Sequence, residues 1–195
     1  MMDSILWVGL RAAKFEYATS EPNVEAMNLI NTITASNSSG LSDTTSFLLS
    51  YKTYLVTFEN LLPGQNNVGL QCVVHSGGTF SSSSYNGNNF APSGAAITTL
   101  NSSTFIPLNA TGGSAGQANT GPGLCGYLMF CNPAASSNHN IGGLIWYNTA
   151  NSPSQGSPFT VGTLWSGAAA IDGFQINVSS SNIASGTVRV YGIKT

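Results

Sequence analysis

Residues 51–74 read YKTYLVTFENLLPGQNNVGLQCVV, and this stretch decides the fold. Apolar and polar residues alternate in its first part and again in its last part, and PGQNN at 63–67 supplies a turn between them. The apolar positions are Tyr54, Val56 and Phe58 before the turn and Leu70, Cys72 and Val74 after it. We therefore expect two half-buried strands that form an antiparallel pair, most simply as a long hairpin.

The rest of the chain is a series of short apolar segments separated by loops rich in Gly, Ser and Asn. We expect further strands at 29–35, 95–100, 103–108, 124–131, 141–148, 159–165, 173–178 and 187–193, and loops at 76–92, 111–123 and 149–158, the first of which has room for a short edge strand. Eight to ten short strands without a convincing helix predict an all-β protein. The expected architecture is a single jelly-roll-like β-sandwich over residues 26–195, with its first and last strands as neighbours.

The composition is that of a folded protein with few charges. Of 195 residues, 42% are hydrophobic and 10% aromatic, but only 6% are charged, and the formal net charge is −2. Disorder driven by low hydropathy needs few aromatics and high net charge. No apolar run approaches the ~20 residues of a membrane span, and five Lys and Arg residues do not easily form the basic patch that nucleic acid requires. We expect neither a membrane nor a nucleic acid as a partner.

The few charges are unevenly distributed. Residues 60–171 contain no Asp, Glu, Lys or Arg, and nine of the twelve charged residues lie at or before Glu59. A solvent-facing surface normally carries charges of both signs. We therefore expect this neutral body either to pack against copies of itself in a homo-oligomer or to present an exterior of hydroxyls and amides.

Residues 1–25 differ from the body. They hold six of the charged residues together with aromatic side chains, a mixture typical of an interface with an apolar centre and a polar rim. We expect a short N-terminal arm that anchors the body to a larger assembly; the alternative is a frayed terminus. The anchoring residues would be Trp7, Arg11, Phe15 and Tyr17. An acid stands where a signal peptide has its positive region, so no cleaved export signal is expected.

Two strings that resemble catalytic motifs fail on their context. Residues 121–126, GPGLCG, match the dinucleotide-binding string GxGxxG, but a loop precedes them and a strand, not a helix, is expected to follow. Residues 112–116, GGSAG, match the nucleophile elbow GxSxG, which needs an acid and then a histidine after the serine. The acid that follows is Asp172, and no histidine comes after it. We expect no cofactor and no serine hydrolase.

The other reactive side chains favour structural roles. Glu59 and Asp172 are the carboxylates considered for glycoside hydrolysis, and both are more simply explained as strand-end groups. No spacing of Cys and His matches a zinc site, so no metal is expected. Cys125 and Cys131 would share one face of a strand ~20 Å apart, out of disulfide reach. We expect all three cysteines to be small packing residues of a protein assembled in a reducing compartment.

A set of aromatic and amide side chains is suited to a neutral sugar. Its main members are Tyr85, Asn86, Asn88 and Phe90 in one loop and His139 and Trp146 in another region, with Asn89, Asn138, Asn140, Tyr147 and Asn148 beside them. Aromatic faces stack on sugar rings, and uncharged amides hydrogen-bond to hydroxyl groups. The alternative is that Trp146 and Tyr147 point to opposite faces of a strand, so that at least one of them belongs to the core.

Three segments carry a resemblance to a known family: LINTITAS at 29–36, YKTYLVTFENLLP at 51–63 and IASGTVRVYGI at 183–193. In their order and spacing they resemble a family of bacteriophage virion proteins, usually described as tail fibres or phage structural proteins. The resemblance covers residues 26–195 and leaves the first 25 residues unmatched. It implies a jelly-roll-like body on a virion appendage or surface, without enzymatic activity and without catalytic residues.

The sequence therefore predicts a non-enzymatic structural component of a phage particle. The favoured role is that of a tail fibre or appendage protein that binds a glycan of the host surface. We expect it to assemble in the host cytoplasm from several copies, a trimer being favoured, and to contact other virion proteins. The alternatives are a capsid decoration protein and a carbohydrate-binding or glycan-hydrolysing module.

Overall fold

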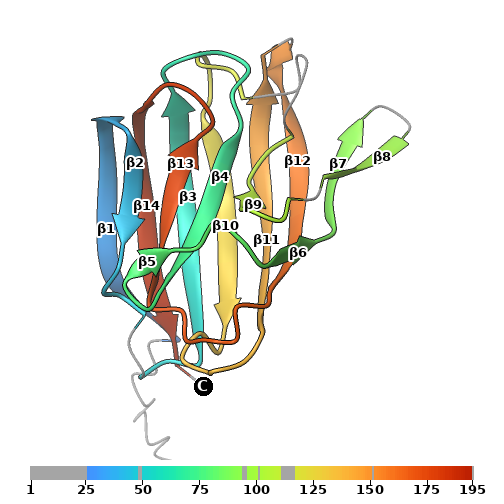
Figure 1. The fold of residues 1–195 in the computed structure, drawn as a ribbon. Coiled ribbons are helices and arrows are strands. Elements are labelled where there is room, and N and C mark those ends of the chain that lie inside the picture. The colour runs from blue at the N-terminus through green and yellow to red at the C-terminus, as the bar shows by residue number, and fades with distance from the viewer. Residues whose placement is uncertain are drawn as a thin grey trace, which may run out of the picture.

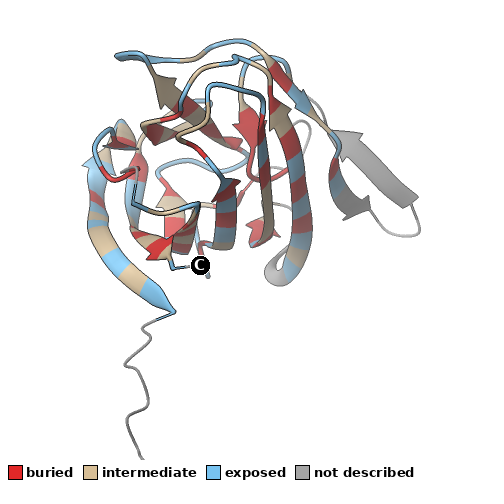
Figure 2. Ribbon diagram, turned by 90° about the horizontal axis from the view of Figure 1, so that it is seen from below, coloured by how far each residue is buried: buried red, intermediate tan, exposed pale blue. Residues whose placement is uncertain are grey.

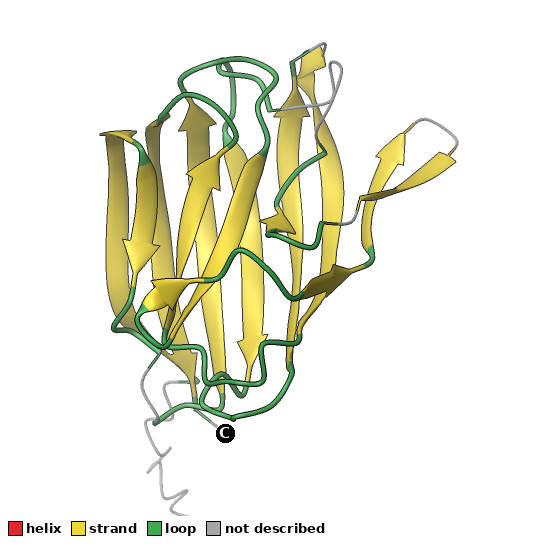
Figure 3. Ribbon diagram, in the orientation of Figure 1, coloured by secondary structure: helices red, strands yellow, loops and turns green. Residues whose placement is uncertain are grey.

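The computed structural model describes residues 26–47, 50–93, 96–100, 102–110, 117–150 and 152–194. The expected anchoring arm at 1–25, with Trp7, Arg11, Phe15 and Tyr17, and the string at 112–116 lie outside these residues. The described part of the chain forms fourteen strands and no helix. Figures 1 and 3 show this all-β architecture. The strands are β1 (Met27–Ser38), β2 (Gly40–Asp43), β3 (Thr53–Pro63), β4 (Leu70–Ser76), β5 (Thr79–Phe80), β6 (Tyr85–Gly87), β7 (Asn89–Ser93), β8 (Ala96–Leu100), β9 (Ile106–Pro107), β10 (Leu124–Cys131), β11 (His139–Thr149), β12 (Ser152–Trp165), β13 (Gly173–Val178) and β14 (Ile183–Ile193).

The strands form two antiparallel sheets. The larger sheet has the order β1-β14-β3-β10-β11-β12-β7-β8, with β6 also paired to β12, and the smaller sheet has the order β2-β13-β4-β5, with β9 also paired to β4. The first and last strands are neighbours, as predicted: Leu29 lies opposite Tyr191 and Ala35 opposite Gly186. The all-β prediction is therefore confirmed.

One hydrophobic core lies between the two sheets. Tyr54 and Val56 of the larger sheet and Ile176 of the smaller sheet are completely buried. Phe130 of β10 stacks on Phe174 of β13 with ring centroids 6.2 Å apart, so the two sheets meet through these rings. Buried and exposed residues alternate along the strands in Figure 2. Each fully buried side chain of this size contributes roughly 2–3 kcal/mol to folding.

The central stretch forms both expected strands but not the expected hairpin. β3 pairs with β10 and β14 in the larger sheet, whereas β4 pairs with β13, β5 and β9 in the smaller sheet. The connection at 64–69 crosses between the sheets and contains Asn67 in the left-handed conformation, at φ 61°. Alternation specifies which face of a strand is buried, and two strands in opposite sheets satisfy it as well as a hairpin does. The predicted faces are correct and the predicted pairing is wrong.

Two expected loops contain more strands than predicted: one short edge strand was allowed at 76–92 and none at 149–158. β12 begins at Ser152 and pairs with β11 inside the predicted loop at 149–158, while β5, β6 and β7 fall within or extend beyond the predicted loop at 76–92. The expected number of eight to ten strands is consequently too low. These segments are rich in small polar residues and show no alternating apolar pattern. Their strands pair through backbone hydrogen bonds, which the side-chain pattern does not reveal.

The cysteines divide into two kinds. Cys72 is fully buried and packs in the core, as predicted. Cys125 and Cys131 share one face of β10, also as predicted, but both are exposed, so the prediction that they pack in the core is wrong. Leu128 and Phe130 occupy the inner face of β10, which leaves the odd-numbered residues on the outer face.

Close contact between β10 and β11 depends on glycine. A Cβ atom at Gly143 would lie 2.1 Å from the carbonyl oxygen of Tyr127, and one at Gly126 would lie 2.3 Å from that of Leu144. Gly126 also has φ +147°, in the region that disfavours other residues.

The described residues include no helix able to cross a membrane.

Candidate functional site

The candidate site lies on the outer face of the larger sheet, the face turned away from the core. On β11, Ile145 and Tyr147 point into the core, and Trp146 between them is 47% exposed. Met129 of β10 points the same way and is 37% exposed. The expectation that Trp146 and Tyr147 face opposite ways is therefore confirmed, with Tyr147 as the core residue.

A pair of glycines leaves a hollow in this outer face. Gly142 of β11 lies directly opposite Gly162 of β12, and Met129 lies opposite Gly142 on its other side. The two missing side chains open a pocket of about 420 Å³ over β10, β11 and β12. This volume falls in the ~300–1,000 Å³ range of small-ligand pockets. We call this pocket the glycine hollow.

The walls of the glycine hollow are amides and apolar side chains. Asn140, Leu164 and Asn86 follow one another across β11, β12 and β6 on one side of the glycines. Asn88 borders the hollow near Gly162. Its backbone N–H donates a hydrogen bond to the Gly162 carbonyl at 2.9 Å. Amides offer both donors and acceptors, while Leu164 and Met129 offer apolar contact.

A second pocket continues the first. It measures about 430 Å³ and shares Asn86 and Asn88 with the glycine hollow, and the side chains of Ser102 and Ser103 add hydroxyl groups to its lining. Asn86 and Asn88 are both exposed, so they are accessible from either pocket. The two pockets together form an elongated polar surface that can contact more than one unit of a chain-like ligand.

The two floor glycines are not required by the packing of the backbone. A Cβ atom at Gly142 would come no closer than 3.7 Å to Val161, and one at Gly162 no closer than 3.4 Å to Asn88. These are ordinary van der Waals contacts, in contrast to the clash at Gly143. The backbone therefore has room for a Cβ atom at either floor position, and a side chain there would project into the hollow.

The hollow is electrically neutral. β6, β10, β11 and β12 all lie within the stretch 60–171 that contains no Asp, Glu, Lys or Arg. The lining residues therefore offer no charged partner to an ionic ligand, whose desolvation would go uncompensated. A neutral ligand that carries hydroxyl groups suits this lining best.

Two of the predicted sugar-contacting residues lie elsewhere than expected. Tyr85 is 2% exposed, and its hydroxyl accepts a hydrogen bond from the Val74 amide at 2.9 Å and donates one to the Ser81 carbonyl at 3.0 Å. Burial raises the pKa of Tyr85 to about 12. His139 is also 2% exposed and stacks on Trp165, with ring centroids 5.8 Å apart. Both rings are buried, so the expectation that they face outward is wrong, although Tyr85 still borders the second pocket.

The other four predicted residues are exposed, but only two of them line the hollow. Asn86 and Asn88 do so. Phe90 is 42% exposed. It lies opposite Thr160, which is two residues before Gly162 on β12. Trp146 is four residues from Gly142 on the same strand, or ~13 Å along it. The structure thus assembles Asn86, Asn88 and Asn140 of the predicted set and adds Met129, Leu164 and the two glycines.

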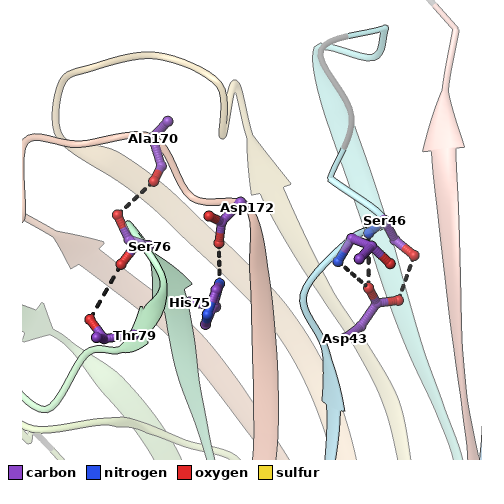
Figure 4. A network of polar contacts seen from close by, with 8 residues as sticks. Asp43, Ser46, His75, Ser76, Thr79, Ala170 and Asp172 are labelled. Carbon is purple, nitrogen blue, oxygen red and sulfur yellow. Dashed lines mark hydrogen bonds and ion pairs between the residues drawn. The ribbon is translucent and has the colours of Figure 1, made fainter.

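The carboxylates considered for hydrolysis have separate partners in separate sheets. Glu59 of β3 forms an ion pair with Arg189 of β14. Asp172, next to β13 in the smaller sheet, pairs with His75 of β4, as Figure 4 shows. The neighbouring hydroxyl of Ser76 donates a hydrogen bond to the Ala170 carbonyl at 2.6 Å. Asp172 is the expected strand-end group, whereas Glu59 lies within β3.

The comparisons with known proteins add no assignment. No family model, no curated protein and no solved structure matches the chain. Within the described residues, no three His, Cys, Asp or Glu side chains gather as metal ligands would.

Proposed function

We propose that this chain is a structural component of a bacteriophage particle, a tail fibre or appendage protein, that binds a neutral glycan of the host surface in the glycine hollow. The observation that carries the binding role is the uncharged, amide-walled pocket over Gly142 and Gly162. Neutral sugars need uncharged hydrogen-bonding groups beside apolar surface, and Asn86, Asn140 and Met129 provide them.

The particle role is supported by the placement of the three segments that resemble phage virion proteins. They correspond to parts of β1, β3 and β14, and these strands lie side by side in the order β1-β14-β3. Segments more than a hundred residues apart in sequence thus form one continuous part of the larger sheet. The resemblance consequently describes a coherent structural unit.

The finer architecture that we propose is a jelly-roll-like β-sandwich. Its support is the nested pairing of the strands: β1 with β14, β2 with β13, β3 with β10, and β4 with β5 and β9. The inner contacts β14 with β3 and β13 with β4 complete the order expected when a long hairpin is wrapped into two sheets. β11 and β12 then extend the larger sheet, and they carry the glycine hollow.

The binding role is tested by filling the hollow. Gly142→Val and Gly162→Val each place a β-branched side chain on the outer face, where the backbone has room for it. Gly156→Val is the matched control, because Gly156 lies on β12, is exposed and has no neighbour nearer than 4.0 Å. The probes are immobilised neutral oligosaccharides, with sulfated and sialylated ones for comparison.

We expect the unmodified chain and Gly156→Val to bind the same neutral oligosaccharides, and Gly142→Val and Gly162→Val to bind them at least tenfold more weakly. Binding of none of the neutral probes would defeat the glycan role, and equal binding by all variants would place the site elsewhere. The hydrolytic alternative is tested with the same sugars. A polysaccharide cleaved by the unmodified chain, but not by a Glu59→Gln, Asp172→Asn variant, would contradict the structural role.

A further inference from the structure

The exposed large hydrophobic residues are concentrated on one face of the molecule. Among the described residues seven such side chains are exposed, and six of them lie on strands of the larger sheet. The six are Met27, Leu29, Phe90, Tyr127, Met129 and Trp146. The seventh, Phe80, lies on β5 of the smaller sheet. Scattered exposed hydrophobics need no explanation, but a contiguous set marks an interaction surface.

The pairing register makes part of this set contiguous. Leu29, Tyr191, Leu55 and Met129 lie directly opposite one another across β1, β14, β3 and β10. Tyr127, two residues before Met129 on the same face of β10, is 38% exposed and adds a fifth member. We call these five residues the outer stripe. It crosses four adjacent strands, ~15 Å at the usual strand spacing.

The charges within the four strands that carry the outer stripe cancel. Glu59 and Arg189, on the same face of β3 and β14, form an ion pair with each other. β10 contributes no charged residue at all. When a surface meets a copy of itself, it presents the same charges to its partner, so unpaired charges near the contact repel. On β1, β3, β10 and β14 the stripe therefore has no net charge to repel a copy, and the exposed Lys52 and Lys194 lie just beyond the ends of β3 and β14.

We propose that copies of this chain associate through the outer stripe. This association goes beyond the binding of a glycan and does not depend on it. An interface with an apolar centre and a neutral surround buries the five side chains without desolvating an unpaired ion. Met129 belongs to the outer stripe and also lines the glycine hollow, so association places the hollow at the margin of the contact, beside the neighbouring copy.

The test compares Met129→Lys with Phe80→Lys in the full chain. Both side chains are 37% exposed, so the two substitutions are matched in exposure and differ in which sheet they occupy. Leu29→Lys, at a residue 51% exposed on the edge strand β1, is a second variant within the stripe. Molar mass is measured by sedimentation over a hundredfold range of concentration, and thermal unfolding verifies that each variant is folded.

We expect the unmodified chain and Phe80→Lys to sediment as the same multiple of 20.2 kDa. Met129→Lys and Leu29→Lys should dissociate at concentrations at least tenfold higher than the unmodified chain. A chain that is monomeric throughout, or stripe variants that assemble like Phe80→Lys, would overturn the proposal.

A thiol measurement distinguishes a copy from another occupant. Cys131 follows Met129 by two residues on the same exposed face, so it should react slowly with a maleimide in the assembled protein and quickly in Met129→Lys. If Cys131 is instead protected in a monomer and becomes reactive when residues 1–25 are deleted, those residues cover the stripe, and the proposal of self-association is wrong.

Discussion

Replacing Asp43 should weaken the contact between the two sheets. Asp43 ends β2 in the smaller sheet, and its carboxylate accepts a hydrogen bond at 2.8 Å from the side-chain amide of Asn31 on β1, in the larger sheet. It also accepts hydrogen bonds from the backbone amides of Thr45 and Ser46 at 3.0 and 2.9 Å, and from the Ser46 hydroxyl, as Figure 4 shows for Ser46. Only 3% of the residue is exposed.

The cost follows from the four donors that share this carboxylate. Asp43→Ala leaves the buried amide and hydroxyl of Ser46 without their acceptor, and unsatisfied buried groups cost about 1–3 kcal/mol each, so the loss should be roughly 3 kcal/mol. Asp43→Asn keeps the shape and one acceptor oxygen but loses the charge, and it should cost about 1–2 kcal/mol. The matched control is Asp172→Asn. The carboxylate of Asp172 is 45% exposed, so its replacement should lower the free energy of unfolding by less than about 1 kcal/mol.

The effect should also depend on pH. Burial raises the pKa of Asp43, but hydrogen bonds from Ser46, Thr45 and Asn31 outweigh burial and hold the pKa below its usual value. A depressed pKa means that the stabilisation is fully present above the unfolded value of about 3.9 and is lost as the pH falls through the lower folded value. Urea unfolding followed by tryptophan fluorescence should therefore give an Asp43→Asn penalty that is constant from pH 7 to 5 and shrinks below about pH 4. An Asn variant as stable as the unmodified chain at pH 7, or a penalty unchanged in acid, would refute this reasoning.

Three further predictions concern the glycines, the core and the arm. Gly143→Ala should lower stability by about 1–3 kcal/mol because of its clash, whereas Gly142→Ala should be neutral or stabilising by up to about 1 kcal/mol; equal melting temperatures would be inconsistent with the close approach of β10 and β11. Tyr85→Phe leaves the backbone amide of Val74 without its acceptor, so it should lower the free energy of unfolding in urea by about 1–2 kcal/mol. Sugar binding should not change, and a loss of binding would mean that the Tyr85 hydroxyl contacts the sugar. Deleting residues 1–25 should leave a folded oligomer that no longer enters particles in a complementation assay, and a monomeric or unfolded product would show that these residues belong to the core.

Alternation in the sequence predicted burial better than it predicted pairing. Tyr54, Val56 and Phe58 were expected on one buried face, and all three lie in the core. That β3 pairs with β14 and β10 rather than with β4 depends on contacts between distant parts of the chain. Such contacts leave no local mark, because a strand with one apolar face can pair with any other strand that faces the same core.

In the candidate site, too, local sequence predicted some residues correctly but did not predict the contacts between distant strands. Asn86 and Asn88 were found because a loop rich in amides is visible in the sequence. His139 was misplaced, although a signal existed: it shares its face with Ile141 and Ile145, which are buried. The floor of the hollow could not be predicted, because it exists only when Gly142 meets Gly162, and that register depends on where β11 ends and β12 begins.

Immunogold electron microscopy of purified phage particles tests the central claim most directly. The particles should come from a phage whose genome encodes this chain, and the antibody should be raised against the folded protein. We expect gold at a fixed position on a tail or other appendage of intact infectious particles, in several copies per particle. Infectious particles that carry no label, with the protein confined to the lysate, would contradict the proposal that this chain is a structural component of the virion.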